Sequence, residues 1–221
     1  MKSNSELQQD VQNAINWEPF IHTAEIGVTA KDGVVTLSGS VNSYSKKINA
    51  ENAAKKVEGV KAIAEDITID YGDSFKKNDT EIAQEILAAW KYDLSVPNDK
   101  IKVRVEDGWV KIEGELAWKY QESASKNAIE NLQGIKGITS LIHVKSESSD
   151  FLEKKEVENA LKRNWSINSV NVKVEVDHNK VKLSGLVDSI YQKEEAGRLA
   201  WSAAGVNSVE NKLAVFYSSQ R

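Results

Sequence analysis

Apolar residues recur along the chain with two different periods. In "ELQQDVQNAINW", "TEIAQEILAAW" and "KEVENALKRNW" they are three or four residues apart, which is the period of an α-helix. In "IKVRVEDGWVKIEGEL" they alternate with polar residues on both sides of Asp107-Gly108, a pattern that predicts two strands joined by a tight turn. Asp32-Gly33 and His178-Asn179 occupy the same place in two other segments, so three such hairpins are expected.

These segments belong to a unit that the chain repeats three times. "DGVVTLSGSV" at 32–41 returns as "DGWVKIEGEL" at 107–116 and as "HNKVKLSGLV" at 178–187. Each copy predicts a helix, two strands, a second helix and a third strand, in that order. The expected fold class is therefore α+β, with three tandem α-β-β-α-β units at 3–71, 78–146 and 152–218.

Eight glycines recur in the repeats and are expected to be structural. They fall in the hairpin turns, in the second strands and after the second helices, which are expected at 43–57, 118–132 and 189–203. Gly39 shares the inward face of its strand with Val35 and Leu37, so we expect its missing side chain to let a helix approach the sheet closely. The full set is Gly33 and Gly108 in turns, Gly39, Gly114 and Gly185 in strands, and Gly59, Gly134 and Gly205 at helix ends.

The combination of "DGVVTLSGSV", an alanine-rich helix and "GV..V...I.V" resembles the BON domain, a family named from bacterial osmotic-shock and nodulation proteins. "IKVRVEDGWVKIEGELAWKYQESASKNAIENLQGIKGITSLIHV" is particularly similar, and three such units cover nearly the whole chain. The third copy departs from the pattern at Asn179, where the turn glycine is lost, and at Lys180.

The resemblance implies a mixed three-stranded sheet covered by two helices in each unit. It also implies a non-enzymatic role, the binding of phospholipid or another hydrophobic ligand, linked to envelope integrity and stress. The family brings no catalytic residues to carry over to this sequence.

Composition removes several classes of chemistry. The absence of cysteine excludes disulfides, thiolate metal sites and thiol catalysis. His22, His143 and His178 lie in different parts of their repeats and have no metal-ligand spacing. No nucleophile elbow, phosphate-binding loop or dinucleotide motif is present, so the sequence predicts neither an enzyme nor a cofactor.

Charge and hydropathy bear on partners and location. The net charge is −4 with both signs interspersed, so no nucleic-acid partner is predicted. No window approaches the ~20 apolar residues of a transmembrane helix. "MKSNSELQQDVQNAINW" lacks the apolar core of a signal peptide, so the sequence as it stands predicts a cytoplasmic protein, or a periplasmic one if a signal peptide has been removed.

The six tryptophans fall into two groups. Trp17, Trp90 and Trp165 stand near the ends of the three first helices, where core or helix-end packing is expected. The other three do not recur and are candidate contacts, because a large apolar side chain where sister repeats carry charge needs a partner. These are Trp109, which replaces Val34 and Lys180, Trp118, and Trp201, which replaces Lys55 and Glu130.

The third copy is the only one with a net positive charge, since residues 151–221 hold 11 basic and 9 acidic residues. If an anionic surface is bound, its candidate contacts are Lys162, Arg163, Lys180 and Lys182, although solvated faces explain these side chains equally well.

Three functional hypotheses remain. The first is binding of a phospholipid surface or a hydrophobic ligand in a stress response. The second is a protein-interaction or self-association module, in which Trp109 and Trp201 form subunit contacts without lipid. The third is an accessory to membrane transport.

Overall fold

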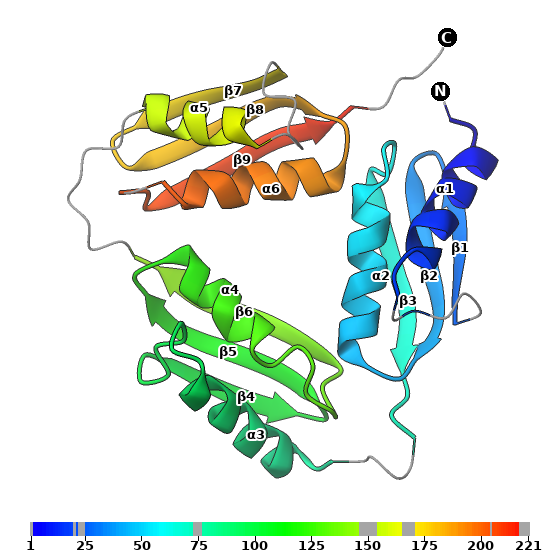
Figure 1. The fold of residues 1–221 in the computed structure, drawn as a ribbon, viewed down its shortest axis with the longest axis vertical. Helices are drawn as coiled ribbons and strands as arrows, with labels where there is room; N and C mark the ends of the chain where they lie inside the picture. Colours follow the sequence, from blue (N-terminus) through cyan, green and yellow to red (C-terminus); the bar gives the residue numbers. More distant parts are fainter. Residues whose placement is uncertain are drawn as a thin grey trace. The chain divides into compact units, whose positions relative to one another are not determined.

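The computed structural model describes residues 2–19, 21, 25–72, 77–145, 154–164, 171–203 and 205–216. Each repeat has the order helix, strand, strand, helix, strand (Figure 1). The first contains α1 (Asn4–Asn16), β1 (Ile26–Lys31), β2 (Val34–Val41), α2 (Tyr44–Lys56) and β3 (Ala62–Ile69). The second contains α3 (Asp79–Tyr92), β4 (Ile101–Glu106), β5 (Trp109–Leu116), α4 (Lys119–Asn127) and β6 (Gly137–Val144). The third contains α5 (Lys154–Arg163), β7 (Val172–Asp177), β8 (Lys180–Val187), α6 (Ile190–Trp201) and β9 (Ser208–Val215).

Each repeat folds around its own three-stranded sheet, with the middle strand coming from the second half of the hairpin. In the second repeat β4 pairs antiparallel with β5, and β5 pairs parallel with β6. The third repeat has the same two pairings. One backbone bond at the end of the last strand recurs in all three copies: Asp70 donates to Val41, Lys145 to Leu116 and Phe216 to Val187. The α+β class and the repeated unit are therefore confirmed.

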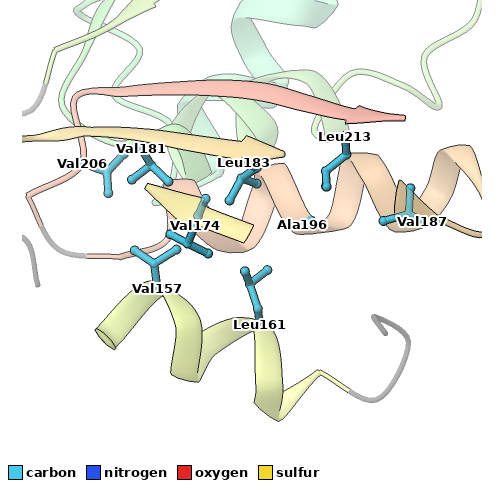
Figure 2. Close-up of a cluster of buried hydrophobic side chains, with 10 residues drawn as sticks. Val157, Leu161, Val174, Val181, Leu183, Val187, Ala196, Val206 and Leu213 are labelled. Carbon is cyan, nitrogen blue, oxygen red and sulfur yellow. The ribbon is translucent and has the colours of Figure 1, made fainter. Parts of the chain in front are cut away.

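The core of each repeat lies between its helices and one face of its sheet. Figure 2 shows this in the third repeat, where Val157 and Leu161 of α5 point toward Val174 and Leu183 of the sheet. Buried residues alternate with half-buried or exposed ones in the first half of each middle strand; Val181 and Leu183, for example, flank the half-buried Lys182. The two periods seen in the sequence thus follow from one cause, which is that each element buries only one face.

In the first two repeats the hairpin turn is held by the first helix of the same repeat. Asp107 and Gly108 have positive φ angles of 50° and 79°, and both backbone N–H groups donate to the carboxylate of Asp79 at 2.9 Å. In the first repeat Asn4 accepts from the N–H of Asp32 in the same way. A tight turn that requires positive φ is thereby fixed to the start of the helix that covers the sheet.

The expectation that the strand glycines let a helix approach the sheet is wrong. Gly39 has φ 143°, and a Cβ atom there would collide with the carbonyl oxygen of Glu25, the residue before the neighbouring strand β1. The same holds for Gly114 against Lys100 and for Gly185 against Asn171. The missing side chain therefore makes room for the backbone of the paired strand and not for a helix.

The expectation for the first group of tryptophans is wrong for Trp17. Core residues of α1 and α3 align without a gap, so Trp90 occupies the place of Ile15, and both are fully buried. Trp17 instead corresponds to Tyr92, and these side chains are 87% and 85% exposed. Trp165 lies outside the described residues.

The second helix is shorter than expected in the second repeat. α4 ends at Asn127, and the chain continues in tighter turns in which Ile129 donates to Lys126 and Leu132 to Ile129. These turns still bury Ile129, so the helix gives way to i→i+3 bonding without loss of the core.

Candidate binding surface on the second repeat

Four large apolar side chains are exposed together at one end of the second repeat. Tyr92 is the last residue of α3 and Leu94 follows it, while Trp118 immediately precedes α4 and Tyr120 lies in the first turn of α4. All four are exposed, with Trp118 the least so at 40%. We call this set the aromatic end.

The fold places these residues at the same end of the unit. Because Ile101 pairs with Gly114, β4 begins where β5 finishes, so the loop after α3 and the start of α4 lie at the same end of the sheet (Figure 1). Trp90 fixes the arrangement from inside, since its indole Nε1 donates to the backbone oxygen of Ser125 on α4 at 2.8 Å. A buried tryptophan thus joins the two helices that carry the exposed side chains.

Trp118 stands at a helix start where the other repeats have a capping serine. Ser43 accepts from the N–H of Lys46 at 3.3 Å, and Ser189 accepts from that of Gln192 at 3.2 Å. Trp118 has no side-chain acceptor, so α4 begins without such a cap, although Gln121 accepts from its N–H at 3.1 Å. The second repeat has lost a stabilising residue type here and exposes an indole in its place.

Glu122, which is only 6% exposed, forms ion pairs with two lysines beside the aromatic end. Burial by itself would raise the pKa of this carboxyl group. Lys119, which forms a short ion pair with it, and Lys126, at 3.5 Å, outweigh burial, so the pKa is lowered. Glu122 is therefore an ionised, paired side chain on the inner side of α4.

This arrangement predicts an acid-sensitive contribution to stability. The folded pKa of Glu122 lies below the unfolded value of about 4.3, so its contribution is complete above that value and is lost as pH falls through the folded pKa. Glu122→Gln should lower the free energy of unfolding by about 1–3 kcal/mol at neutral pH. The difference from wild type should shrink in acid, as measured by urea denaturation across the pH range.

The matched control is Glu115→Gln, which removes an exposed carboxylate 3.9 Å from Lys145. Its effect should be within about 0.5 kcal/mol at every pH, because exposed ion pairs contribute little. An equal pH dependence for both variants would contradict the role assigned to Glu122.

Trp109 lies apart from the aromatic end, beside the hairpin turn at the start of β5. Its side chain is exposed on the outer face of the sheet, opposite Val110 and Ile112, and its ring lies against Gly137 of β6. The surrounding face carries both charge signs, with Arg104 3.4 Å from Glu106 and Lys111 3.3 Å from Glu113. Trp109 and Trp118 therefore lie at opposite ends of β5.

Trp201 is not on an exposed face, contrary to expectation. It is half-buried at the end of α6 and packs against the core of the third repeat. Its apolar partners lie within its own repeat, so the replacement of a charged residue there is explained by local packing.

The four candidate cations of the third repeat do not form one patch. Lys162 and Arg163 are exposed in the last turn of α5, and Arg163 borders a groove of about 780 Å³ along α5 and α6. Lys180 and Lys182 lie on the outer face of the sheet, where Lys182 pairs with Glu175 at 2.9 Å. Acidic neighbours Asp177 and Glu210 further offset the positive charge of this face.

Two negative findings apply to the described ranges. They contain no helix with the length and apolarity to cross a bilayer. Nor do they hold a cluster of three or more histidine and carboxylate side chains placed to bind a metal ion. His143 and His178 are on an outer strand and in a turn, as expected, and His22 is outside these ranges.

The repeated unit also identifies the family. The family model for the BON domain matches residues 3–71, 78–146 and 149–215. The chain belongs to the BON domain family. It is similar to osmotically-inducible protein Y of Escherichia coli (strain K12), with 29% identity over 139 residues that cover 61% of this chain and 69% of that protein.

Two solved structures of CdsD, a structural protein of the type III secretion system of Chlamydia trachomatis, also align with the BON repeats. The first has 15% identity and a TM-score of 0.26, covering 96% of this chain and 92% of that chain. The second, a C-terminal domain, has 16% identity and a TM-score of 0.25, covering 97% and 100%. These scores are too low to support a structural argument.

Sequence reasoning found Trp118 but missed Tyr92, Leu94 and Tyr120. The comparison between BON repeats singles out Trp118, because the other two have Ser43 and Ser189 there, but it does not single out Tyr120, because the third repeat has Tyr191 at that position. Tyr92 and Leu94 also gave no signal, because helical periodicity does not show whether the residues at the end of a helix are covered by the rest of the fold.

Proposed function

We propose that this protein is a non-enzymatic BON-repeat protein that binds phospholipid surfaces peripherally through the aromatic end of its second repeat. The observation that carries the proposal is the exposure of Tyr92, Leu94, Trp118 and Tyr120 at one end of a single unit. The similarity to an osmotically inducible protein supports a role in stress response.

The chemistry of the aromatic end suits the boundary between lipid headgroups and acyl chains. Tryptophan and tyrosine combine an apolar ring with a polar atom, so they are enriched at that boundary. Lys91 and Lys100 are exposed at the same end of the repeat, but Asp93 and Asp99 lie in the same segment, so apolar insertion is expected to provide most of the binding. The expected binding is reversible, because a few inserted side chains and two cations provide far less free energy than a transmembrane helix.

Trp118→Ser tests the proposal and is expected to reduce vesicle binding about tenfold, since one large side chain contributes roughly 1.5–3 kcal/mol of burial. The same change restores a capping hydroxyl and should raise the free energy of unfolding by about 0.5–1 kcal/mol. The measurements are flotation with phosphatidylcholine vesicles, with and without phosphatidylglycerol, at low and physiological salt, and urea denaturation. A loss of binding with a gain in stability cannot be attributed to unfolding.

Trp17→Ser is the matched control, because Trp17 occupies the position of Tyr92 in the first repeat and is equally exposed. It should leave flotation unchanged, whereas Tyr92→Ser should weaken it. Absence of wild-type flotation under all conditions would eliminate the lipid hypothesis, and equal losses for Trp17→Ser and Tyr92→Ser would contradict the assigned surface.

A small hydrophobic ligand is the less favoured alternative. The groove between α5 and α6 has a volume suited to a ligand, but its lining includes Glu156, Asn159 and Arg163. The cytoplasmic location remains a prediction from the sequence, and the proposed binding does not depend on it.

A further inference from the structure

β6 is an outer strand of the second sheet and contains no Asp, Glu, Lys or Arg side chain. The corresponding strand β3 contains Glu65 and Asp66, and β9 contains Glu210 and Lys212. No strand in the described residues pairs with the outer edge of β6. Because charges on edge strands oppose pairing with another chain, the second repeat lacks a protection that the other two repeats have.

The ladder with β5 shows which backbone groups point outward from β6. Lys145 donates to Leu116 of β5, and bonding residues alternate along a parallel ladder, so Leu141 and His143 also face β5. The N–H and C=O groups of Ile138, Ser140, Ile142 and Val144 therefore face the free edge. The N–H of Ile142 has only a long bond of 3.4 Å, to the hydroxyl oxygen of Ser140, which agrees with this assignment.

We propose that β6 pairs antiparallel with β6 of a second copy of this chain, around a two-fold axis at Leu141. Such an axis, perpendicular to the sheet, keeps the helices of both copies on one side and pairs residues that share a face. In this register Ser140 lies opposite the partner's Ile142, and Ile138 opposite the partner's Val144. The backbone groups of all four residues that face the free edge then pair with the second copy. If the axis lay at Thr139 or His143 instead, some of these four residues would have no partner on the other β6.

The residue on the axis distinguishes the second repeat from the others. Leu141 is 44% exposed on the outer face, and pairing would place it against the same side chain of the second copy. The equivalent residues are Asp66 in the first repeat and Lys212 in the third, both exposed. Like charges directly opposite each other destabilise an antiparallel pair, so this register is disfavoured on β3 and β9 and favoured on β6. A charge is compatible with the fold at this position, since both sister repeats carry one.

Cysteine cross-linking tests the register, because the natural chain has no cysteine. Full-length Leu141→Cys should form an intermolecular disulfide about tenfold faster than Thr139→Cys under mild oxidation, because pairing raises the local concentration of the two thiols. Cβ atoms of opposite residues lie about 4.5–5.5 Å apart, close enough for a disulfide after a small adjustment. Thr139 serves as the control because it would face the partner's His143, not another Thr139.

Light scattering of the unmodified chain is the second measurement. The average mass should rise with concentration for wild type and stay monomeric for Leu141→Asp, with vesicle flotation unchanged because Leu141 is not part of the aromatic end. Equal cross-linking rates for Leu141→Cys and Thr139→Cys, or a wild-type mass that stays monomeric at all concentrations, would overturn the proposal. Failure of lipid binding would leave both results intact, so the two proposals are tested separately.

Discussion

Trp90→Ala is expected to lower the free energy of unfolding of the second repeat by about 3–5 kcal/mol. Trp90 is fully buried among the core residues Ile82, Ile86 and Ile112, so its removal leaves a large cavity. The change also leaves the backbone oxygen of Ser125 without its indole donor. A domain of this size has a stability of only about 5 kcal/mol, so about 0–2 kcal/mol should remain, and the second repeat should be unfolded in up to about half of the molecules.

Hydrogen exchange of the full chain, read peptide by peptide, would measure this effect. Protection of β4, β5 and β6 should fall sharply in Trp90→Ala, because local opening governs exchange. Trp17→Ala is the control, and its effect on protection in the first repeat should correspond to less than about 0.5 kcal/mol. The two tryptophans look alike in the sequence, so similar losses for both variants would show that the buried and exposed assignments are wrong.

Gly39→Ala is expected to destabilise the first repeat by about 2–4 kcal/mol. Two costs combine, since an L-residue is strained at φ 143° and the new Cβ atom would meet the backbone oxygen of Glu25. Backbone cannot move aside as a flexible side chain can, so the pairing of β1 with β2 must distort. Urea denaturation and exchange of the β1–β2 hairpin are the measurements.

Gly27→Ala is the matched control on the paired strand. Its φ is not in the left-handed region, and the nearest atom to an added Cβ is the hydroxyl oxygen of Ser38 at an ordinary 3.4 Å. The effect should lie within about 1 kcal/mol of zero. A large loss for Gly27→Ala, or a negligible one for Gly39→Ala, would refute the proposed role of the strand glycine.

Of the four residues of the aromatic end the sequence indicated only Trp118, and it did not indicate the surface that they form. Trp109 and Trp118 are exposed as hypothesised, whereas Trp201 packs against its own core. Lys162, Arg163, Lys180 and Lys182 are spread over two faces, and acidic neighbours offset the charge of one of them. Side chains form a common surface only if the helix and strand ends that carry them lie at the same place in the fold. No local sequence pattern specifies that.

The sequence by itself determined the three repeats, the order of their elements, the hairpin turns and the glycines that follow the second helices. Those features depend on period, chain chirality and the conformational freedom of a few residues, all of which act over short stretches. Only the tertiary structure decided that Trp90 is buried while Trp17 is exposed, and that Gly39 faces the backbone of β1. It also decided that Tyr92 and Trp118 share one end of a unit, because burial and proximity depend on contacts between residues distant in the chain.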